Sequence, residues 1–405
     1  LNKIALQYLS LTKSFSLGDL VEEIKKTNNI NGSLIHPNQR LVIPLVQSTP
    51  ETAKTVPKQP DFEAKGIYLN RYSMASKKMT RLIDELIPAG GNTVILDGKD
   101  MSGRLSYPSR VSLATEIGAN KNPIIRDPAG LFNYLHKRGI HIAVRVVLFY
   151  DPLLVAKKPE LGLRSTSGKR ELEKGIAAWV DPFNLAVQQY NLDIAKELAE
   201  MGADEIQFDY MRFPTTKSSR HLPYGSGEQE IPRHMIITDF LKEARRILAP
   251  YKVLLSIDVF GITAWGRKRD IEATGQKMED LAKYCDVISP MIYPSHFSRP
   301  FQGIANPGVQ PFLLVSETMK KFSALLEGSN VTLRPWIQAF PWRAGRFNKD
   351  YILEELRALH QSKARGWLLW SAGNVYRVAW KALAQWNDSA EKEKTANVDI
   401  FLVYF

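Results

Sequence analysis

Two aspartates, Asp209 and Asp258, are the residues of this chain best placed for acid–base chemistry. Asp209 lies in the sequence EIQFDYMRFP of residues 205–214, in which apolar and polar residues alternate. A period of two is typical of a β-strand, and ionisable groups at the carboxyl end of a strand are typical of parallel α/β enzymes. Asp258 has the corresponding place in the sequence SIDVFG. Two carboxylates can divide the roles of acid, base and nucleophile, so we predict Asp209 as the nucleophile or principal catalytic carboxylate and Asp258 as the acid/base.

The composition is that of a globular chain and limits the classes of partner. Of the 405 residues, 44% are hydrophobic and 24% are charged, which suits one large packed domain and a smaller one. The formal net charge is +12, but the basic residues form no dense run, so we expect no nucleic-acid partner. No apolar run is long enough to cross a membrane. The single cysteine, Cys285, excludes a disulfide within the chain.

Strand and helix patterns alternate from residue 61 onward. Eight strand-like segments, each followed by a helical pattern, are the number found in a (β/α)8 TIM barrel, an α/β fold. The alternative is an open doubly wound sheet, but no glycine-rich phosphate loop follows the first strand. The predicted strands are 66–70, 93–99, 141–149, 205–211, 253–260, 287–293, 334–340 and 366–371. The predicted helices are 76–86, 129–138, 185–201, 235–248, 277–284, 311–326, 351–363 and 376–386.

The alternation along each strand predicts which side chains face the barrel axis. We assign the more aliphatic face of each strand to the surrounding helices, and the opposite face is then polar or aromatic. Burying polar groups from eight strands is costly unless they satisfy one another or face a ligand, so this ring predicts a binding site. The residues predicted to bind substrate are Tyr68, Asp97, Lys99, Asp100, Arg145, Gln207, Arg212, Tyr293, His296, Trp336, Gln338 and Trp370.

The chemistry of this ring suggests a sugar as its ligand. The aromatic members offer flat apolar faces with polar edges, which suit a sugar ring. The cations Lys99, Arg145 and Arg212 would keep Asp209 ionised. The chain has no histidine pair with metal-binding spacing, so we expect no metal and no other cofactor, and we interpret His296 as a hydrogen-bonding loop residue. Asp97 and Asp100, near the end of the second strand, are rivals for the role of the acid.

Residues 1–46 form a separate small segment. Helical spacing of apolar residues predicts helices at 1–9 and 17–26, and HPNQRLVIP at 36–44 predicts a turn and a closing strand. This pattern resembles the LysM module, which implies binding to glycans that contain N-acetylglucosamine, such as peptidoglycan and chitin. The usual opening strand of that module would precede Leu1. The alternative is a helical decoration that packs on the main domain.

The remaining boundaries follow from composition. Residues 47–60 are polar and contain prolines, which predicts a linker. Residues 61–388 are predicted to form the barrel, and residues 389–405 a C-terminal tail.

Five stretches at or after the predicted strands carry a resemblance to a known family. They are ILDGKD at 95–100 with Gly103 and Tyr107, WVDP at 179–182, EIQFDYMRFP at 205–214, SIDVFG at 256–261 and SPMIYPSH at 289–296. Together they resemble a bacterial family described as "putative glycosyl hydrolases", a domain of unknown function with a predicted barrel. The resemblance covers about residues 65–370 and implies glycosidase activity.

A weaker resemblance links the fourth strand to the chitinase-type barrels of family 18. The four acidic positions of their DxxDxDxE motif would fall on Asp204, Gln207, Asp209 and Met211. Because Met211 stands in place of the proton-donating glutamate, this resemblance does not imply chitinase-type, substrate-assisted chemistry. The α-amylase and α-galactosidase barrels, in which the fourth-strand aspartate is the nucleophile, are a closer analogy by position.

We therefore predict a glycoside hydrolase that acts on a bacterial envelope or extracellular polysaccharide. The fourth and fifth strands of a barrel are neighbours about 4.8 Å apart, and a retaining mechanism needs carboxyl groups about 5 to 5.5 Å apart, so retention is favoured. The competing class is a non-catalytic glycan-binding barrel, because the terminal glutamate of the family 18 motif is replaced. A polysaccharide deacetylase or lyase would need a metal or a different base. We expect an extracytoplasmic location with a signal peptide already removed.

Overall fold

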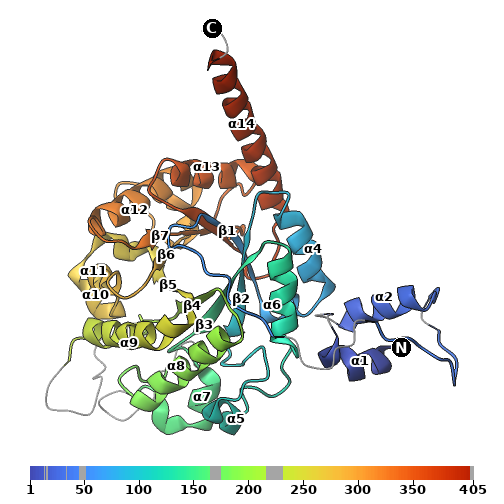
Figure 1. The fold of residues 1–405 in the computed structure, drawn as a ribbon. Coiled ribbons are helices and arrows are strands. Elements are labelled where there is room, and N and C mark those ends of the chain that lie inside the picture. The colour runs from blue at the N-terminus through green and yellow to red at the C-terminus, as the bar shows by residue number, and fades with distance from the viewer. Residues whose placement is uncertain are drawn as a thin grey trace.

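The structure is a computed structural model that describes residues 1–12, 14, 17–32, 34–44, 52–164, 175–215 and 231–401. Its main element is a closed parallel sheet, in which β5 pairs with β6 and completes the ring (Figure 1). The predicted (β/α)8 TIM barrel is thereby confirmed. The strands are β1 Ala64–Leu69, β2 Thr93–Lys99, β3 His141–Val147, β4 Glu205–Asp209, β5 Leu254–Phe260, β6 Val287–Ile292, β7 Thr332–Leu333, β8 Trp336–Gln338 and β9 Gly366–Trp370.

Two short strands, β7 and β8, fill the seventh position of the barrel. Both pair with β6, and Arg334 and Pro335 separate them. Proline has no amide hydrogen to donate to a neighbouring strand, which accounts for the break. The strand predicted over residues 334–340 is therefore interrupted, whereas every other predicted strand is one continuous element.

Helices surround the sheet, as the sequence predicts (Figure 1). The helix predicted over 277–284 is shorter than expected, because α11 has four residues. The last helix is longer than expected and extends away from the barrel (Figure 1). No helix in the described part of the chain is long and apolar enough to span a membrane. The helices that match predicted segments are α4 Lys77–Leu86, α6 Pro128–Lys137, α8 Leu185–Glu200, α9 Arg233–Leu248, α11 Met278–Leu281, α12 Pro311–Leu325, α13 Lys349–His360 and α14 Arg377–Phe401.

The aliphatic faces of the strands form the main core between sheet and helices. Ile206 and Phe208 of β4, for example, are fully buried in this layer. The opposite faces point to the barrel axis, where a separate cluster contains Tyr68, Ile95 and Trp336. The strand alternation thus separates an apolar outer layer from an inner face that carries the polar and aromatic groups.

The N-terminal segment contains two helices, α1 Asn2–Tyr8 and α2 Leu17–Thr27, which lie beside the barrel (Figure 1). Buried apolar residues such as Ala5, Leu20 and Ile24 join them. The prediction of a closing strand near residue 42 is wrong. The side chain of Asn28 instead bonds to both backbone groups of Val42, at 2.7 and 2.8 Å, and no strand forms in the described residues of this segment.

The second half of the predicted linker packs against the barrel. Thr55 donates a hydrogen bond to the carbonyl of Ala203 at 2.8 Å, and the amide of Val56 donates to Asp204 at 2.6 Å. Ala53 is buried against Gly202, where a Cβ atom would lie 2.7 Å from the backbone of Ala53. Residues 52–56 are therefore fixed at the amino-terminal end of β4.

Candidate active site

A pocket of about 590 Å³ opens at the carboxyl ends of the barrel strands. Its volume falls within the range of roughly 300 to 1,000 Å³ that is usual for small-molecule sites. Several residues predicted to form the site line it from six different strands or the loops after them. They are Arg145, Asp209, Arg212, Asp258, Tyr293, His296, Trp336 and Trp370.

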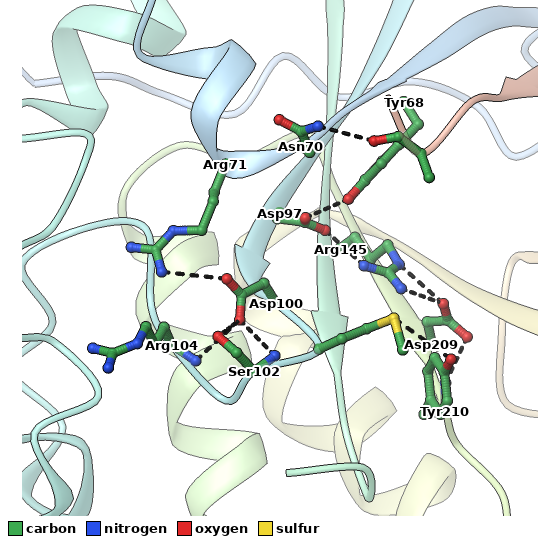
Figure 2. Close-up of polar contacts among 12 residues, drawn as sticks. Tyr68, Asn70, Arg71, Asp97, Asp100, Ser102, Arg104, Arg145, Asp209 and Tyr210 are labelled. Atoms are coloured by element: carbon green, nitrogen blue, oxygen red, sulfur yellow. Dashed lines mark hydrogen bonds and ion pairs between the residues drawn. The ribbon is translucent and has the colours of Figure 1, made fainter. Parts of the chain in front are cut away.

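Asp209 is the last residue of β4, where Figure 2 shows it beside Arg145, and it lines the floor of the pocket. Its Oδ2 atom accepts hydrogen bonds from Nε and Nη2 of Arg145, at 3.0 and 2.6 Å. Its Oδ1 atom accepts a bond from the backbone amide of Tyr210 at 2.6 Å. Tyr210 has a φ of 53°, a left-handed conformation that is costly for a residue with a Cβ and is often found at functional sites. The turn after β4 therefore fixes the carboxylate with donors on both oxygens.

Arg145 of β3 lies between two carboxylates (Figure 2). Its Nη1 atom donates to Asp97 at 2.7 Å, and the hydroxyl of Tyr68 donates to the other oxygen of Asp97 at 2.5 Å. Burial lowers the pKa of Arg145, but Asp209 and Asp97 outweigh it and hold that pKa well above its usual value. Tyr68 and Asp97 were predicted to bind substrate, but they do not line the pocket. Their hydrogen bonds instead hold Arg145 in place.

Asp258 of β5 lies beside Asp209 in the sheet. Phe208 pairs with Ile257, so the next residue on each strand faces the barrel axis at the same level. The Oδ1 atom of Asp258 accepts a hydrogen bond from the indole of Trp336 at 2.7 Å, and the residue is 2% exposed. Burial, and then the nearby Asp209, raise the pKa of Asp258 well above its usual value. The pair thus contains one carboxyl group with a raised pKa and one that accepts hydrogen bonds through both oxygens.

Aromatic rings form one wall of the pocket. Trp370 stacks on Tyr68 with ring centres 4.2 Å apart and an interplanar angle of 21°. Trp336 meets Trp370 at 90°, with ring centres 5.5 Å apart. Tyr293 of the β6 loop also lines the pocket. These fixed rings present flat apolar surfaces close to the two carboxyl groups, an arrangement that suits a sugar ring.

Arg212 contributes a cation to the lining of the pocket. Its guanidinium lies 4.3 Å from the ring centre of Phe260, 4.8 Å from that of Trp179 and 5.0 Å from that of Tyr210. Its Nη1 atom donates a hydrogen bond to the carbonyl of Phe213 at 3.0 Å. Arg212 thus lines the pocket as predicted, but no ion pair links it to Asp209 in the described part of the structure.

The prediction that Lys99 lies at the site is wrong. The sheet register shifts between Asp97 and Lys99, as in a β-bulge, and this turns the lysine to the outside of the barrel. Its ammonium group is buried there, 2.9 Å from Asp151 and 2.7 Å from the side-chain oxygen of Asn191. Lys99 therefore joins β2 to Asp151 and to α8, and it does not line the pocket.

Asp100 also fails to reach the pocket. It receives a bond from Arg71 at 3.3 Å, and its Oδ1 atom accepts bonds from the amides of Ser102 and Arg104 at 2.8 and 3.2 Å (Figure 2). Aspartate commonly organises a loop in this way. Asp100 thus shapes the loop that brings Met101 to the pocket, and it does not itself line the pocket.

Two predicted amide side chains lie away from the pocket surface. Gln207 faces the axis but sits two residues below Asp209, and a rise of about 3.3 Å per residue leaves it buried beneath the floor. Gln338 accepts a hydrogen bond from the amide of Ser295 at 3.1 Å. Its amide group donates to the carbonyls of Phe340 and Trp342, at 2.9 and 3.2 Å. Gln338 therefore joins two loops and does not line the pocket.

The prediction missed several pocket residues because most of them belong to loops. Loops have no periodicity that would mark a residue as facing inward. Tyr210 was detectable, since it follows Asp209 directly in the strand motif. The missed lining residues are Met101, Tyr210, Phe260, Gly261, Ile262, Met291, Phe297 and Ser298. In the described part of the chain, no group of His, Cys, Asp or Glu side chains is arranged to hold a metal ion.

The family described as "Putative glycosyl hydrolase domain" matches residues 66–376, which contain all the barrel strands except the first two residues of β1. No curated protein matches the sequence.

Solved structures with a similar fold include known sugar-cleaving enzymes. The glycoside hydrolase domain of PgaB (BpsB) from Bordetella bronchiseptica is 14% identical, with a TM-score of 0.54 over 79% of this chain and 97% of its own. A β-galactosidase from the psychrophilic Marinomonas ef1 is 11% identical, with a TM-score of 0.53 over 76% of this chain and 54% of its own. A hypothetical protein from Ruminiclostridium thermocellum ATCC 27405 is 34% identical over 48% of this chain and 97% of its own, with a TM-score of 0.42. The first two show a shared barrel fold.

Proposed function

The chain belongs to the family described as "Putative glycosyl hydrolase domain", and from this premise we propose that it hydrolyses glycosidic bonds of a bacterial envelope or extracellular polysaccharide. The observation that carries the proposal is the pair Asp209 and Asp258 on the floor of an aromatic pocket. Burial and Asp209 raise the pKa of Asp258, as an acid catalyst requires. We further propose an extracytoplasmic location, where such polysaccharides occur.

In the proposed reaction, Asp258 protonates the leaving oxygen. Trp336 donates to its Oδ1 atom, so the proton belongs on Oδ2, where it can pass to the glycosidic oxygen. As the bond to that oxygen breaks, positive charge develops at the anomeric carbon of the sugar. Asp209, an acceptor through both oxygens, is the group that stabilises this charge.

A retaining mechanism accounts best for the closeness of the two residues. Adjacent strands lie about 4.8 Å apart, near the separation of about 5 to 5.5 Å between carboxyl groups in retaining enzymes. Asp209 would then attack the anomeric carbon and form a covalent ester with the sugar. A water molecule, deprotonated by Asp258, would displace Asp209 and regenerate both groups.

Arg145 and the aromatic rings prepare the site for this chemistry. Arg145 holds Asp209 in place and is itself held by Asp97, so the nucleophile needs no rearrangement when substrate binds. Trp336 and Trp370 present rings at right angles, and a sugar can stack on one while its edge meets the other. These contacts place the substrate next to the two carboxyl groups.

The proposal is tested with a panel of bacterial polysaccharides and purified full-length protein. Mass spectrometry of the soluble products should show shorter glycans with the wild type and none above background with Asp258→Asn or Asp209→Asn. The matched control is Glu355→Gln, which changes a buried carboxyl group outside the pocket. Retention of a polysaccharide on the protein without any product would favour the alternative, a non-catalytic glycan-binding barrel.

A further inference from the structure

A half-exposed tryptophan, Trp342, lies at the rim of the pocket. It belongs to the loop between β8 and α13 and is 49% exposed, although tryptophan is usually one of the more buried residues. Rings that expose a flat face beside a ligand pocket commonly contribute to recognition. Trp342 is not part of the pocket wall, so its exposure needs a separate explanation.

A chain of ring contacts connects Trp342 with the pocket. Its ring centre lies 5.0 Å from that of His296, which lines the pocket. His296 in turn meets Tyr293 at 5.4 Å and Phe340 at 5.6 Å. Burial, and then Arg343, lower the pKa of His296, which disfavours the charged form of its imidazole. The aromatic surface therefore continues from the pocket wall to the rim through His296.

Hydrogen bonds hold this rim in place before any ligand binds. Gln338 joins the amide of Ser295 to the carbonyl of Trp342, and thus the β6 loop to the β8 loop. Arg299 donates to the carbonyl of Arg343 at 3.0 Å, and the guanidinium of Arg343 lies 4.4 Å from the centre of the Trp342 ring. A surface fixed in advance binds a ligand with less loss of conformational entropy.

We propose that Trp342 and His296 form a second sugar-binding surface, here called the rim platform, next to the catalytic pocket. This inference rests on the proposed function. It means that the substrate is a glycan chain longer than the pocket. One sugar of that chain lies between the carboxyl groups, and a later unit lies on the rim platform. Arg343, whose guanidinium lies over the Trp342 ring, supplies a hydrogen-bond donor for a hydroxyl group of that unit.

The rim platform predicts an affinity that increases with chain length. The loss of a ring from a good stacking contact should weaken binding about 3- to 10-fold. A sugar that fills only the pocket does not reach Trp342, and its affinity should not depend on the indole.

The test measures binding by isothermal titration in the Asp258→Asn background, which prevents turnover. The probe is a length series of oligosaccharides from whichever polysaccharide of the panel the wild type cleaves or, failing cleavage, retains. Adding Trp342→Ala should weaken binding of the longer oligosaccharides 3- to 10-fold, and Trp342→Phe should restore part of it. Tyr72→Ala is the matched control, because Tyr72 is 74% exposed in the short helix Arg71–Met74 and does not line the pocket, so its loss should leave binding unchanged.

Each result bears on a different claim. Cleavage by the wild type together with an unchanged length dependence in Trp342→Ala would overturn the rim platform and leave the proposed function standing. An equal loss in Tyr72→Ala would also overturn it, because the effect would not be specific to Trp342. If no glycan of the panel is cleaved or bound, the proposed function fails and the rim platform fails with it.

Discussion

Replacing Asp258 by asparagine should abolish activity and make the fold more stable at neutral and alkaline pH. The amide has the same shape, and its oxygen can still accept the hydrogen bond from Trp336. Activity should fall by roughly 10²- to 10⁴-fold, the usual contribution of a general acid. Most substitutions in a protein core lower stability. This one should raise it, because the substitution removes a carboxyl group that is costly to ionise in the folded state.

Proton linkage gives the size of the stability effect. An unfolded aspartate has a pKa near 3.8, whereas burial and Asp209 raise the pKa of Asp258 in the folded state. Between these two values the folded protein retains a proton that the unfolded chain has released. The wild type therefore loses stability as pH rises, by about tenfold in the folding equilibrium per pH unit, and the loss ends at the folded pKa. Asparagine does not titrate. The folding equilibrium constant of the variant, relative to that of the wild type, should therefore grow about tenfold per pH unit and then level off.

The assay compares urea unfolding of the two proteins in steps from pH 4 upward. In parallel, kcat/KM of the wild type is measured on the cleaved glycan. The pH at which the stability difference levels off should coincide with the alkaline limb of kcat/KM, because the same proton governs both. Glu355→Gln is the control: burial raises the pKa of Glu355 as well, so stability should respond in the same direction while activity is kept. A stability difference that does not change with pH would refute the protonated Asp258, and an alkaline limb at another pH would assign the acid to another group.

Three further predictions concern Asp209, Lys99 and the N-terminal segment. Asp209→Asn should lower activity at least 100-fold. It should also lower the free energy of unfolding in urea by about 1 to 3 kcal/mol, because an amide nitrogen would face the Tyr210 donor. Retained activity in the folded fraction would make Asp209 a structural residue. Lys99→Met should cost about 3 to 5 kcal/mol, since it leaves Asp151 buried without its cation, while kcat/KM stays within twofold; a specific loss of kcat/KM would return Lys99 to the site. Deleting residues 1–44 should weaken pull-down on insoluble peptidoglycan or chitin with unchanged turnover of a soluble substrate, and equal pull-down would show that the segment does not bind.

The barrel and its inner face could be predicted because both rest on periodicity. A period of two placed Asp209 and Asp258 on the axis, and the number of strand–helix pairs placed them on adjacent strands. The sequence predicts Arg145 as one of three cations near Asp209, but which of the three bonds to it could not be predicted, because that depends on the register and depth of the strands. Depth also explains Gln207, which lies on the correct face but below the floor of the pocket.

Local irregularities account for the remaining errors. The β-bulge that turns Lys99 outward adds one residue to a regular strand, and Gly98 beside it is the only sign of it in the sequence. The closing strand predicted near residue 42 is absent because its backbone bonds to the side chain of Asn28. Side chains that compete for backbone groups leave no periodic pattern, so their effect appears only in the folded chain.

The most direct test of the central claim is the source of the oxygen in the product. The glycan that the wild type cleaves is incubated with the enzyme in water enriched in oxygen-18, and the masses of the products are measured by mass spectrometry. A hydrolase that uses Asp209 and Asp258 should place one heavy oxygen at each new reducing end, and Asp258→Asn should yield almost none. Unsaturated products without heavy oxygen would indicate a lyase, and release of labelled acetate from an uncut chain would indicate a deacetylase. Either result would contradict the assignment of the two aspartates to glycoside hydrolysis.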